Sequence, residues 1–261
     1  MPLLGLGVFQ ITDETECVAA IHAAFEYDYR HIDTAKLYEN EVAVGKAVRE
    51  SGIDREELFI TTKIWPTDFG CDSARRAFET SLGKLALDYV DLYMIHWPVR
   101  EGTEETWEVM QGLRDEGLIR SIGVSNFSPR RFDQQFFKRT DEVPAVNQFE
   151  RHAFNTKPEW VAYCRQKGIL TEAYCPLNRG QRLDDPQLVQ LAEKYAKTSA
   201  QILLRHQIQE GIAVIPKSSR PERIRENADI FDFEISTQDM HALDALDEGK
   251  PAADGLEKGW F

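Results

Sequence analysis

Cysteine is scarce in this chain, which has only four cysteines among 261 residues. They lie at Cys17, Cys71, Cys164 and Cys175, and they include no C-x-x-C pair and no histidine at the spacing of a zinc partner. We therefore expect a reduced, cytoplasmic protein that has no disulfide framework and binds no metal.

Long apolar runs are also missing, since none approaches the roughly 20 residues of a membrane-spanning helix. The N-terminus, MPLLGLGVFQITDETE, lacks the basic start of a signal peptide and soon turns acidic. No proline-, glycine- or serine-rich linker and no low-complexity tract divides the sequence. We expect one globular domain over residues 1–261.

Basic residues are outnumbered, with 31 lysines and arginines against 44 acidic residues and a net charge of −13. This balance argues against nucleic acid and anionic membranes as partners, because both bind basic surfaces. The acid excess fits selection for solubility in concentrated salt, and it also fits an ordinary acidic cytosolic protein.

A regular alternation of β-rich and amphipathic segments runs along the whole chain. Strands are expected over 3–9, 30–34, 58–63, 89–96, 119–126, 145–150, 169–174 and 212–218. Helices are expected between them, for example over 14–27, 40–51, 72–85 and 104–116. Thr12 and Asp13 are placed to cap the first of these helices, and Gly117 is placed to end the last. Eight such units predict an α/β fold, a (β/α)8 TIM barrel of parallel strands.

An open doubly wound sheet is the competing fold for this alternation. Such a sheet binds dinucleotides through a G-x-G-x-x-G pattern after its first strand. Gly5 and Gly7 begin that pattern, but its third glycine would fall at Gln10. The barrel is therefore the favoured fold.

Polar side chains end several of the expected strands. Asp33, Lys63 and His96 end three successive strands, and Tyr38 follows Asp33 closely. In a barrel the C-terminal strand ends meet at one rim, so these four residues should be neighbours. Each also has an ordinary explanation: Asp33 could cap a helix, Lys63 could be solvated, His96 could lie in the core, and Tyr38 could be a surface aromatic. Their joint arrival at one rim favours a shared chemical role.

These four side chains have the properties of a proton-donating site. A tyrosine has a pKa of about 10 in water, which is high for acid–base work at neutral pH. We expect the Lys63 ammonium, held by Asp33, to lower the pKa of Tyr38, and His96 to offer an N–H to a substrate oxygen. The set contains no nucleophile and no cluster of metal ligands, so a cofactor must supply the electrons.

A basic turn, IPKSSRPERIREN, follows the last expected strand at residues 215–227. Its hydroxyls and the cations Lys217, Arg220, Arg223 and Arg225 lie at the start of a helix, an arrangement that binds phosphate. A solvated basic face is the alternative, most readily for Arg220 and Arg225. Tyr174 offers a flat face on which a nicotinamide could stack, or it could simply pack at the barrel end.

From about Gly5 to Asp247 the chain resembles the aldo-keto reductases, especially bacterial and archaeal members that act on keto-sugars and small aldehydes. The matching motifs are HIDTAKLYENE, TTKIW, YVDLYMIHWP, GLIRSIGVSNF, VNQFERH, EAYCPL and IPKSSRPERIRENADIFDFEIS. The resemblance implies a barrel that binds NADPH or NADP in an extended form, with NADH bound more weakly. It also implies a catalytic tetrad in which Tyr38 is the general acid/base, Lys63 and Asp33 tune it, and His96 orients the carbonyl.

The resemblance also implies how the cofactor is held. Ser125, Asn126 and Gln148 would bind the nicotinamide carboxamide, with Tyr174 beneath the ring. The other implied cofactor residues are Leu177, Lys217, Ser218, Ser219, Arg223, Glu226 and Asn227. Among these, Lys217 and Arg223 favour the 2′-phosphate of NADP, and Glu226 would meet the adenine or ribose. Phe9, Trp65, His96 and Trp97 would line the substrate pocket, although the three aromatics could also belong to the core.

The chain departs from the family pattern in several places. It starts at the first barrel strand, without the family's N-terminal β-hairpin, so the barrel bottom is either exposed or covered by another segment. The loop after Trp97 is short, Cys175 replaces a common serine, and Trp260 or Phe261 could fold toward the rim. The short loop, together with the brief tail after Gly249, predicts an open substrate pocket.

The favoured function is an NADPH-dependent carbonyl reductase that converts an aldehyde, ketone or keto-sugar into an alcohol. Its partner would be a small carbonyl compound, and we expect a monomer. The alternative is a cofactor-sensing regulatory module on the same barrel, as in a potassium-channel subunit of this family type. A metal-dependent barrel lyase or isomerase lacks its ligands.

Overall fold

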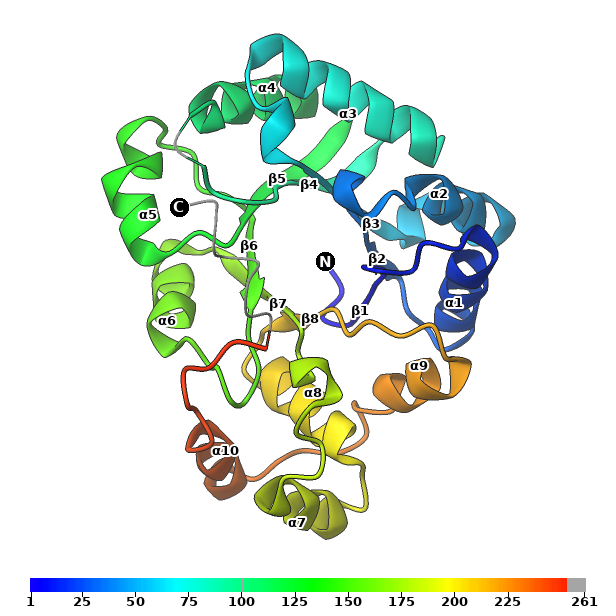
Figure 1. Ribbon diagram of the computed structural model, residues 1–261, viewed down its shortest axis with the longest axis vertical. Helices are drawn as coiled ribbons and strands as arrows, with labels where there is room; N and C mark the ends of the chain where they lie inside the picture. Colours follow the sequence, from blue (N-terminus) through cyan, green and yellow to red (C-terminus); the bar gives the residue numbers. More distant parts are fainter. Residues whose placement is uncertain (100, 253–261) are drawn as a thin grey trace.

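The computed structural model describes residues 1–99 and 101–252. Eight parallel strands follow one another in chain order around its centre (Figure 1). Bridges between Leu4 and Val214 and between Gly7 and Lys217 join the last strand to the first. The sheet therefore closes into the expected (β/α)8 barrel, and no β-hairpin precedes the first strand in the described residues. The expected placement of Trp260 or Phe261 lies outside the described part of the chain.

The elements alternate as a barrel requires. The strands are β1 (Gly5–Gly7), β2 (His31–Asp33), β3 (Phe59–Ile64), β4 (Val90–Ile95), β5 (Ile119–Ser125), β6 (Val146–Glu150), β7 (Leu170–Tyr174) and β8 (Ala213–Val214). The α-helices are α1 (Glu14–Glu26), α2 (Glu41–Glu50), α3 (Cys71–Leu85), α4 (Thr103–Asp115), α5 (Pro129–Gln134), α6 (Pro158–Lys167), α7 (Pro186–Tyr195), α8 (Ser199–Gln209), α9 (Pro221–Ala228) and α10 (Thr237–Asp244). Short 3-10 helices are η1 (Lys36–Tyr38), η2 (Arg55–Glu57), η3 (Pro66–Asp68), η4 (Phe136–Lys138) and η5 (Asn178–Gly180).

The expected boundaries agree closely with the observed ones except at the first and last strands; the first was expected over 3–9 and spans only Gly5–Gly7. The Asp13 side chain caps α1 by accepting a hydrogen bond from the Glu16 N–H at 2.8 Å. Gly117 follows α4 with a φ of 81°, a left-handed conformation that suits glycine. The strand expected over 212–218 is shorter because Pro216 has no N–H for the ladder.

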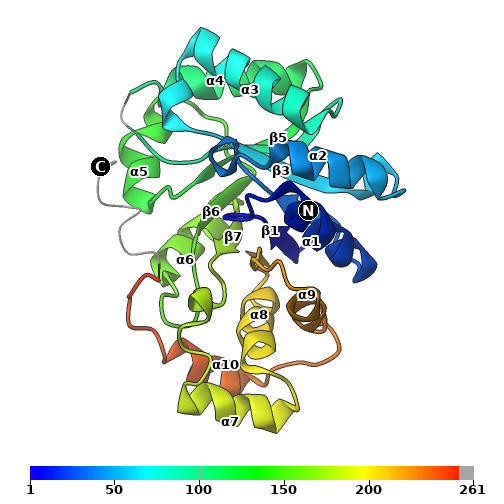
Figure 2. The same ribbon diagram turned by 45° about the vertical axis from the view of Figure 1, so that its right-hand side comes forward.

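Two helices, α7 and α10, lie beyond α8 and outside the ring around the barrel (Figures 1 and 2). Lys194 of α7 binds Asp239 of α10 at 2.6 Å, and His206 of α8 binds Asp244 of α10 at 2.8 Å. These bonds hold α10 against α7 and α8. Among the described helices, none combines the length and apolar character needed to cross a membrane.

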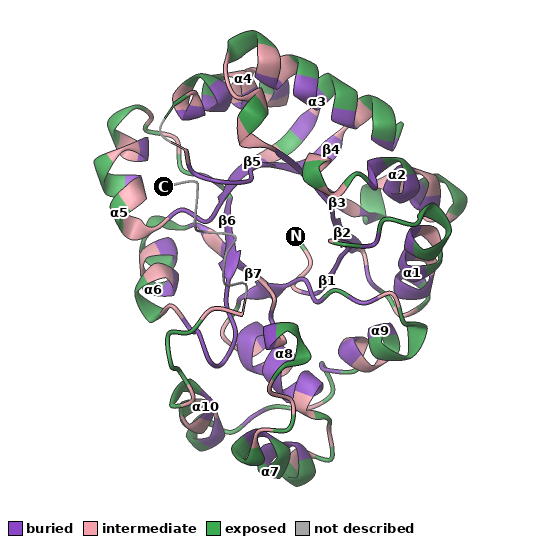
Figure 3. Ribbon diagram, viewed as in Figure 1, coloured by how far each residue is buried: buried purple, intermediate pink, exposed green. Residues whose placement is uncertain are grey.

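The main core lies between the strands and the surrounding helices, and the strands are almost entirely buried (Figure 3). Inside the barrel, Leu92, Met94 and Val146 form a small separate apolar cluster. Toward the C-terminal strand ends the interior is instead polar, and Asp33 and Lys63 are nearly inaccessible to solvent there. Buried charges are costly unless they are paired, so this end of the barrel must contain their partners.

Candidate active site

The four residues predicted to act together do converge at the ends of β2, β3 and β4. Asp33 ends β2, Lys63 lies in β3, His96 follows β4, and Tyr38 ends η1. The Lys63 Nζ lies 5.1 Å from the centre of the Tyr38 ring. The Tyr38 and His96 rings are 5.7 Å apart in an edge-to-face arrangement. A phenol, an ammonium and an imidazole therefore meet at one point on the rim.

Asp33 forms a buried ion pair and is not a helix cap. Its Oδ1 accepts a hydrogen bond from Lys63 Nζ at 2.6 Å, and its Oδ2 accepts one from Gln148 Nε2 at 2.9 Å. Lys63 also donates to the carbonyl oxygen of Thr34 at 2.9 Å. With both charges paired and hydrogen-bonded, the arrangement meets the condition for burying an ion pair.

The expected direction of the Tyr38 pKa was wrong. Burial, followed by the negative charge of Asp33, raises the pKa of Tyr38 well above its usual value. The Lys63 ammonium does not reverse this shift because it is already paired with Asp33. Tyr38 therefore keeps its proton at neutral pH, and its side chain, only partly buried, is suited to donate that proton.

His96 is held as a neutral imidazole. Burial, followed by the positive charge of Lys63, lowers the pKa of His96 well below its usual range. A neutral imidazole carries a single N–H, which donates a hydrogen bond without adding a second positive charge to the site. Such a group can orient a carbonyl oxygen beside the Tyr38 hydroxyl.

We call the residues predicted to hold the nicotinamide the nicotinamide end. They are Ser125 of β5, Asn126 directly after it, Gln148 of β6 and Tyr174 of β7. Asn126 Nδ2 donates to Ser125 Oγ at 2.9 Å and to the carbonyl oxygen of His96 at 3.2 Å. The Tyr174 hydroxyl donates to Asn126 Oδ1 at 3.0 Å. Since these bonds fix Asn126 and link it to His96, the nicotinamide end is preorganised and directly connected to the tetrad.

Aromatic side chains surround the tetrad. The Phe9 ring lies 4.9 Å from that of Tyr38, and the Trp65 ring lies 5.1 Å from that of His96. Both are partly exposed, whereas Trp97 is buried. An ion pair between Lys36 of η1 and Asp68 of η3 joins the segments next to Tyr38 and Trp65. Phe9 and Trp65 are thus placed to contact a substrate.

The basic turn after β8 begins on the same rim, because Lys217 bridges to Gly7 of β1. We call Lys217, Ser218, Ser219, Arg223 and Asn227 the phosphate end. Within the described residues, the side chains of the exposed Lys217 and Arg223 form no ion pair. Ser218 Oγ accepts a hydrogen bond from the Arg220 N–H at 3.1 Å, which shapes the turn. Unpaired cations beside a hydroxyl in a strongly acidic chain fit a phosphate group.

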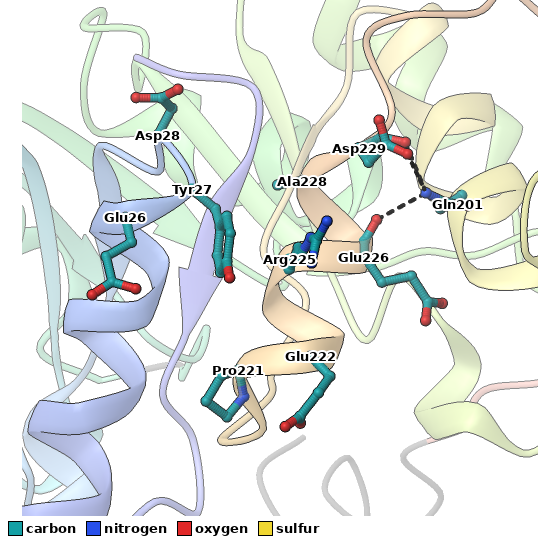
Figure 4. Close-up of a pocket in the computed structure, with 10 residues that line it drawn as sticks. All are labelled: Glu26, Tyr27, Asp28, Gln201, Pro221, Glu222, Arg225, Glu226, Ala228 and Asp229. Carbon is teal, nitrogen blue, oxygen red and sulfur yellow. Dashed lines mark hydrogen bonds between the residues drawn. The ribbon is translucent and has the colours of Figure 1, made fainter.

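A groove of about 830 Å³ lies between α1 and α9 (Figure 4). Glu226, expected to meet the adenine or ribose, lines this groove and accepts a hydrogen bond from Thr198 Oγ1 at 2.7 Å. Arg225 lines the same groove, and five of the other lining residues are acidic: Glu26, Asp28, Glu222, Glu226 and Asp229. Arg225 is exposed and forms no ion pair with the described residues, as expected for a solvated cation. Leu177, the remaining predicted cofactor residue, follows β7 and is partly buried.

Two buried titratable groups beneath the tetrad escaped the sequence analysis. Burial, followed by the charge of Asp33, raises the pKa of Glu172 to about 8. Burial, followed by the charge of Lys63, lowers the pKa of His31 to about 3. Both could have been found from the alternation of side chains along a strand, because His31 shares a face with Asp33 and Glu172 shares one with Tyr174.

Comparison with known proteins gives consistent matches over nearly the whole chain. A sequence model of the Aldo/keto reductase family matches residues 3–248. The glyoxal reductase of Bacillus subtilis is 47% identical over 248 residues, covering 95% of this chain and 90% of the relative. A crystal structure of an aldo-keto reductase from a Medee basin deep-sea metagenome library has a TM-score of 0.93 at 40% identity, covering 96% of this chain and 93% of the other. A Bombyx mori aldo-keto reductase crystallised with NADP has a TM-score of 0.91 at 38% identity, covering 97% and 92%.

Proposed function

The chain belongs to the aldo/keto reductase family of oxidoreductases, and from this premise we propose that it is an NADPH-dependent carbonyl reductase. Its substrate would be an aldehyde, a ketone or a keto-sugar, and its product the corresponding alcohol. The observation that carries the proposal is the Tyr38 phenol, protonated at neutral pH, beside the buried Lys63–Asp33 pair and the neutral His96.

The described residues fit a phosphorylated dinucleotide. At the phosphate end, Lys217 and Arg223 are exposed cations without an ion-pair partner among the described residues. At the nicotinamide end, Asn126 and Gln148 would hold the carboxamide, and Tyr174 would lie against the ring. When bound, the reduced nicotinamide supplies a hydride to the carbonyl carbon.

The protein's own residues would handle the proton and the developing charge. His96 donates its N–H to the carbonyl oxygen and aligns it with the Tyr38 hydroxyl. As negative charge grows on that oxygen, Tyr38 transfers its proton to it and becomes a phenolate. The nearby Lys63 ammonium stabilises the phenolate, and Asp33 keeps Lys63 in place. Because Tyr38 is partly exposed, water can return its proton after the alcohol leaves.

A carbonyl panel tests the proposal. The protein is mixed with NADPH and, separately, with methylglyoxal, keto-sugars and aromatic aldehydes, while the NADPH absorbance is followed. We expect consumption of NADPH with at least one carbonyl class and formation of the matching alcohol. Binding of NADPH without consumption across the panel would contradict the reductase and favour the regulatory module.

A further inference from the structure

A chain of buried polar side chains crosses the barrel interior beneath the tetrad. Gln148 lies at its centre, because its Nε2 donates to Asp33 Oδ2 at 2.9 Å and to Glu172 Oε2 at 2.7 Å. Gln148 and Glu172 are direct neighbours in the register of β6 and β7. Asp33 lies on β2, across the barrel. The single amide of Gln148 thus connects the catalytic ion pair to a second carboxyl group.

This double donation fixes the orientation of the Gln148 amide. An amide nitrogen has two protons, and here one goes to each carboxyl group. Rotating the amide by half a turn would place its carbonyl oxygen against two acceptors, which is repulsive. Gln148 Oε1 accepts no hydrogen bond from the described residues. The side chain therefore presents a fixed, unused acceptor at the nicotinamide end.

Glu172 is well suited to hold this orientation because it is itself constrained. Its side chain is completely buried, and its Oε1 faces His31 Nδ1 at 3.7 Å. These two buried atoms make no hydrogen bond in the described residues, and the other ring nitrogen of His31 binds Thr61 Oγ1 at 3.1 Å. A proton on Oε1 would point toward His31 and leave Oε2 as an acceptor. Whether Glu172 is neutral or charged, Oε2 can accept from Gln148.

We propose that Glu172 is a positioning residue for the nicotinamide. Together with Asp33, it fixes the Gln148 amide so that Oε1 accepts a hydrogen bond from the amide group of the ring carboxamide. This inference rests on the proposed NADPH-dependent function and adds a residue that acts through Gln148 without touching the cofactor. It also assigns Asp33 a second task beside the pairing of Lys63.

The test compares two ligands that would both bind at the phosphate end. NADPH carries the nicotinamide, whereas 2′,5′-ADP carries the 2′-phosphate and lacks the nicotinamide. Glu172→Met removes the acceptor, and we expect NADPH affinity to fall about tenfold, the loss expected from one hydrogen bond. The affinity for 2′,5′-ADP should stay within about twofold, because the phosphate end is untouched. An equal loss for both ligands, or no loss for either, overturns the inference.

Two matched variants separate positioning from packing. Glu172→Gln keeps an acceptor at Oε2 and adds a donor toward His31, so it should retain NADPH affinity near that of the wild type. Thr171→Val changes the adjacent buried residue on the other face of β7 and should alter neither affinity. If Glu172→Gln loses as much NADPH affinity as Glu172→Met, the acceptor role is wrong.

A measurement on the wild type covers the case in which Glu172→Met fails to fold. In a ¹⁵N-labelled sample, both side-chain amide protons of Gln148 should exchange slowly with solvent, because both are buried and bonded. Rapid exchange of either proton would overturn the proposed orientation. Wild-type NADPH binding and turnover in the same assays report on the function itself. If the wild type shows neither, the proposed function fails. If the wild type binds and turns over NADPH and Glu172→Met binds it equally well, only the role of Glu172 is removed.

Discussion

At the nicotinamide end, buried side chains are bonded to one another, whereas at the phosphate end exposed cations have no ion-pair partner among the described residues. Gln148 and Asn126 are both buried, and their amide groups make hydrogen bonds that fix them. Lys217 and Arg223 are exposed on the turn and helix that follow β8. The same rim thus carries one rigid polar region and one open charged region.

The difference matches what each end would do in the proposed reductase. A ring that delivers hydride has to be aligned closely with the substrate, and buried bonded groups hold such an alignment. A phosphate needs only positive charge and donors that can reach it, which flexible surface side chains provide. We infer that the nicotinamide end determines geometry and rate, and that the phosphate end determines affinity and the choice of NADPH over NADH.

Tyr38→Phe should give the largest effect and separate rate from affinity most clearly. It removes the proton donor but leaves both ends of the cofactor site unchanged. We expect kcat for carbonyl reduction to fall by about a thousandfold, within the usual range for losing a general acid, with NADPH affinity within about twofold. Steady-state kinetics and a fluorescence titration measure the two quantities. Near-normal turnover would remove Tyr38 from its proposed role.

The buried region should respond to pH through Glu172. Its pKa in the folded protein is about 8, raised by burial and then by Asp33 from an ordinary value of 4.5. Between those values the folded state holds a proton that the unfolded state releases, so stability falls as pH rises from about 4.5 to about 8. The expected loss is on the order of a few kcal/mol.

Urea unfolding of wild type and Glu172→Gln at several pH values measures this contribution. Glutamine cannot ionise, so the difference in unfolding free energy between the two proteins should change steadily with pH over this range. The subtraction removes the contribution of other groups, such as Asp239, whose pKa is lowered to about 2 by bonds to Lys194, Tyr195 and Ser236. A constant difference across the range would show that Glu172 is already ionised in the fold.

The barrel and the convergence of Asp33, Tyr38, Lys63 and His96 could be predicted from the sequence because their signals are local and repeated. Each strand is a short β-rich run, and polar residues such as Asp33, Lys63 and His96 interrupt these runs at their C-terminal ends. Parallel closure then brings the ends together without further information. The last strand was predicted too long because Pro216, inside an otherwise β-rich run, cannot donate a ladder hydrogen bond.

The electrostatics of the site could not be read from the sequence in the same way. The pKa of Tyr38 depends on how deeply it is buried and on whether Lys63 is already neutralised by Asp33, which only three-dimensional geometry reveals. Glu172 was missed although it shares a strand face with Tyr174, because its partner Gln148 lies on another strand. The groove that Arg225 lines is formed by segments far apart in the sequence, the end of α1 and helix α9, so its acidic lining could not be read from the basic turn alone.

Neutralising the phosphate end should reduce affinity without reducing the rate at saturation. We expect Lys217→Met and Arg223→Met each to weaken NADPH binding by about tenfold or more, because each loses a charged hydrogen bond to phosphate. NADH binding should change much less. Arg225→Met is the matched control, because Arg225 lies on the same helix as Arg223 but lines the acidic groove between α1 and α9. Equal losses for NADPH and NADH would contradict the assignment of the 2′-phosphate to Lys217 and Arg223.

Salt should weaken binding at the phosphate end and leave the nicotinamide end unaffected. We expect this effect to be smaller than those of Tyr38→Phe, of pH on Glu172 and of the substitutions at Lys217 and Arg223. Between low salt and about 0.5 M, screening of the exposed cations should weaken NADPH binding a few-fold. The net charge of −13 has the opposite influence, since salt also screens its repulsion of any anionic dinucleotide. The ratio of NADPH to NADH affinity largely cancels that general repulsion, so this ratio should fall as salt rises. The value of kcat at saturating NADPH should stay constant, because buried groups are little screened. A ratio that does not change with salt would mean that Lys217 and Arg223 do not discriminate between the two cofactors by charge.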